Sequence, residues 1–308
     1  MNFSVKVKNQ IIEERLSQRC CRLSCLAGYL RTAGTIEIQK GKIGFSTTSE
    51  HTINAFFSRI IYSLYGVEAQ TVTEKEGGRS KMTLISDVSL QILKDAEILS
   101  VTPSGIDVQL NIKDTLVNRP CCRTAYLKGA FLGSGSITVP KLKSDKATGY
   151  HLEFVFSKYL TALDFSHLLS DNGYIAKLVE RKDSFVVYFK NSEEICDILV
   201  LMGAKGASLD LMDIIVKKTV RNNTNRVINC EISNMTKQID ASLKCREEIT
   251  KISDVIGLDS LPLPLKEVAI ARLDYPDDTL SALSARLGIT KSCLSHRLKK
   301  LSLISESL

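Results

Sequence analysis

The cysteine thiols are the side chains of this sequence that are best suited to bind a metal. Nine cysteines occur, and adjacent pairs stand at Cys20-Cys21 and at Cys121-Cys122. Cys25 follows Cys21 by four residues, so the two would share one face of a helix. Thiolates bind zinc and iron–sulfur clusters, which would make Cys21, Cys25 and the second pair a metal site. The alternative is small buried side chains suited to close helix packing. The sequence has no C-x-x-C pair, which disfavours zinc ribbons, and we favour packing. We expect no metal and no cofactor.

Other catalytic chemistry has little support in the residue pattern. The four histidines are scattered along the chain. The run Gly133-Ser134-Gly135 lacks the third glycine of a dinucleotide-binding fingerprint and precedes a predicted strand rather than a helix. Neither a phosphate-binding P-loop nor a G-x-S-x-G nucleophile elbow occurs in the sequence. These observations disfavour the common nucleotide-dependent and hydrolytic enzymes.

Positive charge gathers near the C-terminal end of the sequence. Between Thr279 and Leu301 lie five basic residues and no acidic residue. Apolar residues recur there at helical spacing on both sides of Gly288, which predicts a helix-turn-helix with its second helix in the major groove of DNA. Lysine and arginine would mostly contact phosphates, whereas Ser292, Ser295 and His296 would read bases. The predicted DNA-binding residues are Thr290, Lys291, Ser292, Ser295, His296, Arg297, Lys299 and Lys300.

The elements around this motif carry their own signals. Thr279 and Thr290 are placed to cap the two helices, and Ser284 is small where they would cross. Residues 232–252 read as one long helix, 261–264 as a rigid break and 265–273 as another helix. Further backbone contacts are expected from Lys217, Lys218, Arg221, Arg226 and Arg286. The alternatives are a helical hairpin without a ligand and, for residues 217–226, a solvated linker.

Composition fits a globular protein with a nucleic-acid partner. Hydrophobic residues make up 44% of the chain and charged residues 24%, and the net charge is +7. Residues 1–10 are too polar for a signal peptide, and no apolar run approaches the length of a membrane span. We expect a cytoplasmic, nucleoid-associated protein with reduced thiols and no membrane contact.

An internal repeat organises the first two thirds of the sequence. Residues 20–28 read CCRLSCLAG and residues 121–129 read CCRTAYLKG, and the register continues through Gly34-Thr35-Ile36 and Gly135-Ser136-Ile137. We infer two copies of one unit, each roughly 100 residues long. A helix opens each copy, and we expect the terminal glycine to end it in the left-handed conformation.

Each copy follows the order α-β-β-α-β-β-α, which predicts an α+β fold rather than a doubly wound one. The pattern of hydrophobic residues and turns predicts the following elements in the first copy: helix 19–32, strands 35–38 and 42–45, a helix from about 49, strands 69–73 and 81–85, and helix 88–94. The second copy is predicted as helix 119–132, strands 136–140 and 150–157 around a lysine-rich loop, a helix from about 161, strands 175–180 and 184–189, and helix 192–202. The hairpin turns are expected at 39–41, 76–78 and 181–183.

The opening helix of each copy resembles the LAGLIDADG motif of homing endonucleases. The motif region reads LAGYLRTAG at 26–34 and LKGAFLGSG at 127–135. The resemblance implies two such helices packed at a pseudo-twofold axis, where small residues allow close approach. Active members carry a metal-binding acidic residue before the last glycine, but Ala33 and Ser134 stand there. An alanine and a serine cannot replace two carboxylates as ligands of a hard cation, so we expect no nuclease activity and no catalytic residues.

Two LAGLIDADG-like units followed by residues 225–230 (NRVINC) and the helix-turn-helix resemble the WhiA family of sporulation and cell-division regulators over nearly the whole chain. The resemblance implies a transcription regulator of division and chromosome-segregation genes, with promoter DNA and other transcription regulators as partners. We expect two LAGLIDADG-like repeats at 1–115 and 116–218 and a linker helix with the DNA-binding domain at 219–308. The competing hypotheses are a metal-dependent endonuclease with relocated ligands and a non-enzymatic protein-docking factor.

Overall fold

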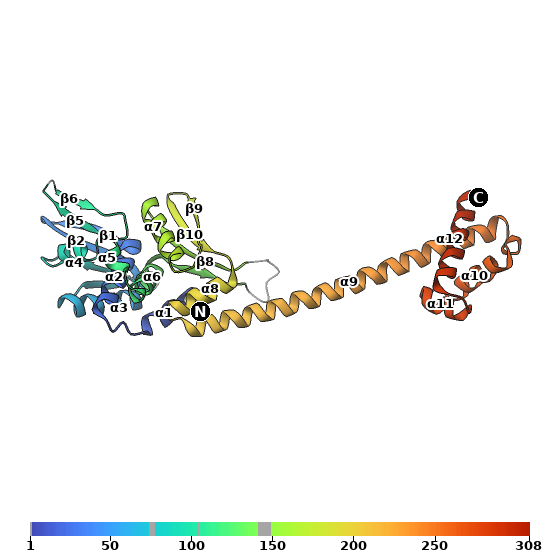
Figure 1. The fold of residues 1–308 in the computed structure, drawn as a ribbon, viewed down its shortest axis with the longest axis horizontal. Coiled ribbons are helices and arrows are strands. Elements are labelled where there is room, and N and C mark those ends of the chain that lie inside the picture. The colour runs from blue at the N-terminus through green and yellow to red at the C-terminus, as the bar shows by residue number, and fades with distance from the viewer. Residues whose placement is uncertain (1, 74–77, 104, 141–148) are drawn as a thin grey trace. The chain divides into compact units, whose positions relative to one another are not determined.

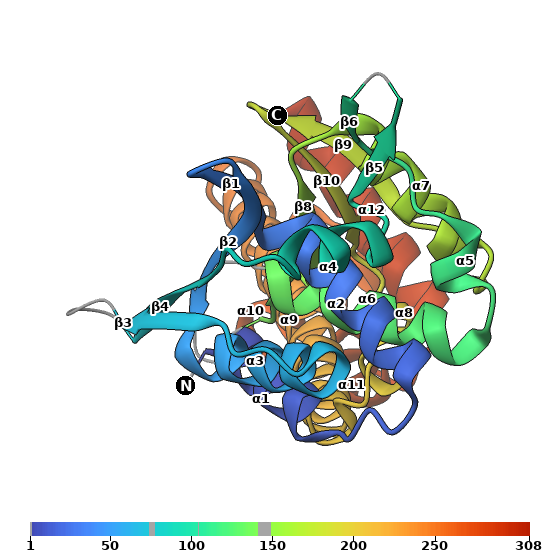
Figure 2. The same ribbon diagram turned by 90° about the vertical axis from the view of Figure 1, so that its left-hand side faces the viewer.

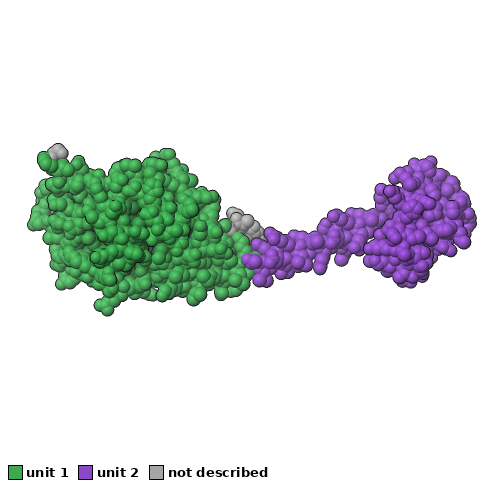
Figure 3. Space-filling model, in the orientation of Figure 1, with its two compact units in different colours: residues 1–218 green, residues 219–308 purple. Residues whose placement is uncertain are grey.

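A computed structural model describes residues 2–73, 78–103, 105–140 and 149–308. The chain divides into two compact units, residues 1–218 and residues 219–308, which are described separately below (Figure 3). Among the helices of the described residues, none is both long enough and apolar enough to cross a membrane.

The first repeat of unit 1 begins with a helix that the sequence pattern did not reveal, α1 (Phe3–Glu13). The elements that follow are α2 (Arg19–Ala33), β1 (Gly34–Gln39), β2 (Lys42–Glu50), α3 (His51–Tyr65), β3 (Gln70–Thr73), β4 (Arg79–Leu84) and α4 (Ser89–Asp95) (Figure 1). A short hairpin of β5 (Leu99–Thr102) and β6 (Gly105–Val108) and the single turn α5 (Asp114–Val117) lead to the second repeat. The sequence did not predict these three elements.

The second repeat has the same order of elements as α2 to α4 of the first. It consists of α6 (Pro120–Ser134), β7 (Ser136–Thr138), β8 (His151–Phe156), α7 (Tyr159–Ser170), β9 (Lys177–Arg181), β10 (Ser184–Phe189) and α8 (Ser192–Leu201). The lysine-rich loop between β7 and β8 and most of the predicted turn at 76–78 lie outside the described residues.

The two sheets confirm the predicted repeat. Their strand orders are β1-β2-β4-β3 and β7-β8-β10-β9, and every pairing is antiparallel. Helix α3 packs on β2 and β4, and α7 packs on β8, β9 and β10, so helices cover one face of each sheet. The alternation along β8, with Leu152, Phe154 and Phe156 buried, is what a half-buried strand requires. The predicted α+β class with pseudo-twofold repeats is therefore confirmed.

Helices α2 and α6 run through the middle of unit 1 and pack directly on each other (Figure 2). Their approach is as close as the sequence predicted. A Cβ atom added to Gly28 would lie 2.3 Å from the carbonyl oxygen of Tyr126, and one added to Gly129 would lie 1.9 Å from that of Cys25. Both positions therefore require glycine, because no other residue lets the two backbones come this near.

The prediction that a left-handed glycine ends each of these two helices is wrong. Gly34 has φ −80° and ψ 139° and Gly135 has φ −71° and ψ 142°, so neither glycine is left-handed. Steric contact explains both residues instead. A Cβ atom at Gly34 would lie 2.3 Å from the Leu30 carbonyl oxygen, and one at Gly135 would lie 2.2 Å from the Phe131 ring. The chain leaves each helix directly into a strand, and only glycine fits at the bend.

A fully paired polar network lies inside the first repeat. The hydroxyl groups of Tyr29 and Thr47 donate to Asn54 Oδ1 at 2.7 and 2.9 Å, and the Asn54 amide donates to the Ser80 carbonyl oxygen at 2.7 Å. All four residues belong to different elements: α2, β2, α3 and β4. Because an unpaired polar group would be costly in the core, this network favours one arrangement of helices on the sheet.

Unit 2 contains the end of a helix much longer than expected. Helix α9 (Lys205–Val255) extends well beyond the predicted 232–252, so the basic residues at 217–226 lie on a helix rather than in a linker. After the 3-10 turn η1 (Leu258–Ser260), α10 (Leu263–Asp274) begins within the segment predicted as a break. Pro264 sits in its first turn, where proline is tolerated because no intrahelical N–H bond is lost. Helices α11 (Leu280–Arg286) and α12 (Lys291–Ser307) complete the unit.

Candidate nucleic-acid interface

The helix-turn-helix forms from the signals that predicted it. Thr279 caps α11, its hydroxyl accepting the N–H of Ala282 at 3.2 Å, and Thr290 caps α12 by accepting the N–H of Cys293 at 3.2 Å. Between the helices, Gly288 has φ 64°, a conformation that favours glycine. The predicted caps and the predicted turn are all confirmed.

The inner faces of α11 and α12 build the core of unit 2. Leu283, Leu294 and Leu301 are buried together with Ile249 and Ile252 of α9 and with apolar residues of α10. Ser284 is also buried, and its hydroxyl donates to the Ser281 carbonyl oxygen at 2.9 Å. The second helix is therefore held firmly by its apolar stripe, which leaves its other face to solvent.

That outer face carries the polar and basic residues singled out in the sequence. Exposed on α12 are Lys291, Ser292, Ser295, His296, Lys299 and Lys300. Residues three and four apart share one side of a helix, so Ser292, Ser295 and Lys299 form a continuous surface. Thr290 lies at the start of that surface, but its hydroxyl already accepts the Cys293 N–H and lies 3.1 Å from the Ser292 hydroxyl.

Two of the expected arginines are engaged inside unit 2. Arg297 is half-buried, and its guanidinium donates to the Pro264 carbonyl oxygen at 3.3 Å. Arg286 forms an ion pair with Asp278 and lies 4.0 Å from the centre of the Tyr275 ring. Both side chains thus link α11 and α12 to neighbouring parts of unit 2.

The other expected backbone contacts lie on α9. Lys217 is 3.7 Å from the Asp213 carboxylate one turn earlier, and the Lys218 ammonium lies 5.1 Å from the centre of the Tyr150 ring. Arg221 and Arg226 lie further along the same helix with exposed side chains. Lys217 and Lys218 belong to unit 1, whereas Arg221 and Arg226 belong to unit 2, the unit that contains α12.

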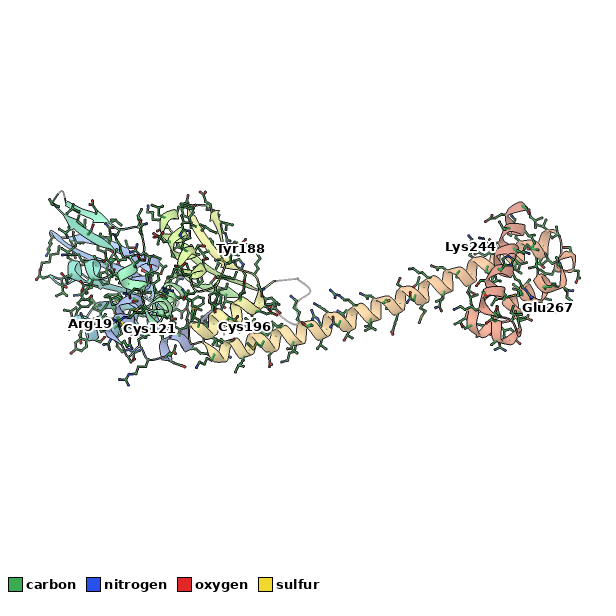
Figure 4. All side chains as sticks on the ribbon, in the orientation of Figure 1. Arg19, Cys121, Tyr188, Cys196, Lys244 and Glu267 are labelled. Carbon is green, nitrogen blue, oxygen red and sulfur yellow. The ribbon has the colours of Figure 1, made fainter. Side chains whose placement is uncertain are left out.

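A groove beside the recognition helix is a feature that the sequence pattern did not indicate. It has a volume of about 790 Å³ and runs between the C-terminal part of α9 and α12. Lys237, Lys244 and Arg246 of α9 line it together with Ser295 and Lys299 of α12. Lys244, labelled in Figure 4, lies 3.7 Å from the Glu248 carboxylate, and Asp277 and Asp278 also line the groove, so both signs of charge meet there. The sequence of α9 carries no pattern specific to DNA binding, and only the structure shows that its C-terminal part lines this groove.

The two positions at which an endonuclease would hold its carboxylates have other surroundings here. Ala33 ends α2, and Ser134 ends α6, where its hydroxyl accepts the Val155 N–H at 3.1 Å. Arg31 stands two residues before Ala33, at the other position where the letters LAGLIDADG have an acidic residue. Its guanidinium donates to the carbonyl oxygens of Glu97 and Gln109 at 2.7 and 2.8 Å. These groups tie the helix ends to neighbouring strands and hairpins, and none of them is an anionic ligand.

The cysteines are arranged differently from the expected set. Cys25 is completely buried in the core, as the packing interpretation predicted. The sulfur atoms that come together are those of Cys20, Cys21, Cys121 and Cys122, all within 4.8 Å of one another. Cys20 was therefore missed, although its place in the repeat relates it to Cys121 in the way that Cys21 relates to Cys122.

Known proteins match both parts of the chain. Residues 123–221 match the family described as the WhiA LAGLIDADG-like domain, and residues 224–305 match the WhiA C-terminal HTH domain. A probable cell division protein WhiA from Alkaliphilus oremlandii is 34% identical over 100% of this chain and 98% of its own length. The corresponding protein from Thermoanaerobacter pseudethanolicus is 36% identical with the same coverage.

A solved structure supports the fold. The crystal structure of full-length DUF199/WhiA from Thermotoga maritima matches with a TM-score of 0.59 at 21% identity, over 100% of this chain and 99% of that chain. The sequence relatives establish more than this structural likeness does, because they share over 30% of their residues along the whole chain. With its LAGLIDADG-like repeats and its DNA-binding helix-turn-helix domain, the chain belongs to the WhiA family of cell division proteins.

Proposed function

We propose that this protein is a sequence-specific transcription regulator that binds promoter DNA through α12 and does not cleave it. The observation that carries the proposal is the outer face of α12, where Ser292, Ser295 and His296 lie among exposed lysines on a helix fixed by its buried leucines. A helix of this kind, second in a helix-turn-helix, presents polar side chains to base edges in the major groove.

Different side chains on this face would do different work. Ser295 and His296 are exposed and uncharged or weakly basic, so they suit hydrogen bonding to bases. Lys291, Lys299 and Lys300 would neutralise phosphates, which adds affinity but little preference for sequence. Thr290 would act on DNA mainly by fixing the start of α12, because its hydroxyl caps the helix.

The remaining basic residues have supporting roles in this proposal. Lys217, Lys218, Arg221 and Arg226 on α9 would contact the DNA backbone. Arg286 and Arg297 are held by Asp278 and by the Pro264 carbonyl oxygen, so we assign them first to positioning the helix-turn-helix and only second to phosphate contact.

A binding-site selection followed by titration tests the proposal. Random double-stranded DNA is bound to the full chain, the enriched sequence is recovered, and variants are titrated on that sequence and on a scrambled one. We expect Ser295→Ala and His296→Ala to reduce the ratio of the two affinities, each by about tenfold. Lys299→Ala should weaken binding to both DNAs alike. If no sequence is enriched, or if none of the three variants changes binding, α12 is not the recognition helix.

The absence of catalysis is the second part of the proposal. Its support is that Ala33 and Ser134 replace the metal-binding carboxylates and that Arg31 is tied to backbone carbonyls. We expect the enriched DNA to remain intact in the presence of Mg²⁺ or Mn²⁺. Cleavage that a chelator abolishes would instead support the alternative, an endonuclease with relocated ligands.

The cellular role that we propose is supported by the relatives, which are named as probable cell division proteins. We propose regulation of division and chromosome-segregation genes, and of sporulation where it occurs, by a protein located on the nucleoid in the cytoplasm. Depletion should change the transcripts of such genes. Wild-type protein should restore them, whereas a Ser295→Ala/His296→Ala double variant should not.

The domain boundaries also remain proposals. The junction expected at 115/116 lies inside α5, and the one at 218/219 lies inside α9. We propose that α5 links the two repeats and that α9 is shared between the repeat unit and the DNA-binding unit.

A further inference from the structure

Four cysteines meet where the first turns of α2 and α6 come together. Cys20 and Cys21 lie in the first turn of α2, and Cys121 and Cys122 lie in the first turn of α6. Their four Sγ atoms are all within 4.8 Å of one another, and those of Cys121 and Cys122 are 4.0 Å apart. All four are free thiols, and Cys121, labelled in Figure 4, is exposed to solvent. This is the only group of at least three such ligand residues among the described parts of the chain.

The spacing of the sulfur atoms matches one kind of ligand. A zinc ion bound tetrahedrally by four thiolates has Zn–S bonds of about 2.3 Å, which places its sulfurs about 3.8 Å apart. The observed separations need only a small contraction to reach this value. An iron–sulfur cluster would spread the cysteine sulfurs more widely, because each sulfur of a cubane binds a different iron atom. The compact arrangement therefore favours a single ion.

Groups that stabilise negative charge surround the four sulfur atoms, whereas burial in the metal-free protein raises the pKa of Cys21 to about 12 and that of Cys122 to about 11. Backbone N–H groups and the positive end of a helix dipole face the first turn of each helix, and both stabilise negative charge. Four thiolates and one Zn²⁺ carry a net charge of −2. Arginines flank each cysteine pair, at Arg19 and Arg22 and again at Arg119 and Arg123, and supply compensating positive charge nearby in the chain. The flanking differs in one residue, because Pro120 stands between Arg119 and Cys121.

A polar side chain, Gln18, also contacts two of the sulfur atoms. Gln18 precedes α2 without capping the helix with its side chain. Its Oε1 atom lies 3.4 Å from Cys20 Sγ and 3.8 Å from Cys121 Sγ, so the amide already touches sulfurs of both helices. Rotation of the amide by half a turn would direct its NH₂ group at the same sulfurs, which suits thiolates bound to a metal.

We propose that Cys20, Cys21, Cys121 and Cys122 bind one zinc ion at the pseudo-twofold axis. Binding replaces four S–H bonds by four Zn–S bonds and releases four protons, without oxidation or reduction. Each repeat contributes two ligands, so the ion joins the N-terminal ends of α2 and α6. The ion cross-links α2 and α6 and so stabilises their packing. The site takes no part in DNA recognition by α12.

Metal analysis of the full chain tests the proposal. The protein is purified with a reductant, stripped of metal with a chelator, reloaded with Zn²⁺ and passed through a desalting column. We expect about one zinc ion per chain by mass spectrometry, and the absorption bands of tetrahedral thiolate coordination when Co²⁺ replaces Zn²⁺. The Cys20→Ser/Cys121→Ser variant should lose at least nine tenths of the metal. The matched control, Cys230→Ser, removes an exposed cysteine of α9 and should retain it.

A second measurement distinguishes a variant that has lost its metal ligands from one that has failed to fold. Circular dichroism compares the double variant with the wild type, and a variant that retains its helix content but binds no metal supports the site. Removal of zinc from the wild type should lower its midpoint of thermal unfolding by several degrees, since binding stabilises the folded state. Less than about one ion in ten chains after reloading would overturn the proposal. Full zinc binding by the folded double variant would overturn it too, because the ion would then lie elsewhere.

Discussion

At the scale of single residues, two buried tyrosines on the paired helices differ in one hydrogen bond. The Tyr29 hydroxyl donates to Asn54 Oδ1 at 2.7 Å. The Tyr126 hydroxyl is buried and has no hydrogen-bond partner among the described residues. Burial raises the pKa of Tyr126 to about 12, so this hydroxyl keeps its proton at neutral pH. One tyrosine therefore stabilises the fold through its oxygen, whereas the other pays a desolvation cost for it.

This difference predicts opposite effects of the same substitution. Tyr126→Phe removes an unpaired polar atom, so the free energy of unfolding should rise by up to about 1 kcal/mol. Tyr29→Phe removes a donor from a paired network and should lower it by about 1 kcal/mol. Urea denaturation of both variants measures the two changes. Equal losses in both would show that the Tyr126 hydroxyl has a partner after all.

At the scale of elements, the contact between α2 and α6 depends on glycine. Gly129→Ala would place a methyl group 1.9 Å from the Cys25 carbonyl oxygen, so one helix must move away. We expect a loss of about 3 kcal/mol or more in the free energy of unfolding. Gly149→Ala is the matched control, because nothing lies within 4 Å of its added Cβ atom. A Gly129→Ala variant as stable as this control would contradict the close packing.

The start of the recognition helix offers a test that needs no DNA. Thr290→Ala removes the oxygen that accepts the Cys293 N–H and should destabilise unit 2 by about 1 kcal/mol, whereas Thr290→Ser should retain the cap. Thermal unfolding of the free protein measures the loss. If Ala and Ser behave alike there, the hydroxyl does not act as a cap, and any effect on DNA binding is direct.

Elements with a local signal could be predicted from the sequence, whereas others depend on distant partners. The repeated strands and the helix-turn-helix follow from periodicity, caps and turns. Helix α1 has only a short local signal, the Asn2 cap and the buried pair Val7 and Ile11, and it was missed. Distant contacts also fix it: Ser4 Oγ donates to the Ile137 carbonyl oxygen at 3.0 Å, and Gln10 Oε1 accepts the Ala207 N–H at 2.9 Å. Its partners lie more than 130 residues away, out of reach of any local pattern.

The two candidate sites, the outer face of α12 and the cysteine group, also differ in how far they could be predicted from the sequence. The outer face of α12 could be predicted because one helix positions all of its residues. The cysteine group could not, since it depends on the rotation of two helices about their axes. Helical spacing paired Cys21 with Cys25, but the first turns bring Cys20 to the group and leave Cys25 in the core.

At the scale of the whole molecule, the proposed DNA binding depends on how many basic residues contact phosphates. The chain has a net charge of +7, and basic residues lie on α12, beside the groove and along α9. Each phosphate that a lysine or arginine neutralises releases bound counterions, so the logarithm of affinity falls linearly with the logarithm of salt concentration. The slope of that line counts the phosphate contacts of the whole chain.

The slope also separates contacts that lie in different elements. Lys299→Gln on α12 and Arg226→Gln on α9 should each reduce it by about 0.9, and a double variant by about twice that if both helices contact phosphates in the same complex. Neither change should alter the preferred sequence. Lys42→Gln in unit 1, where Lys42 lies 2.7 Å from the Asp87 carboxylate, serves as the control and should leave the slope unchanged. A slope that responds to Lys299→Gln but not to Arg226→Gln would confine DNA contact to the helix-turn-helix, and α9 would then serve only to connect the two units.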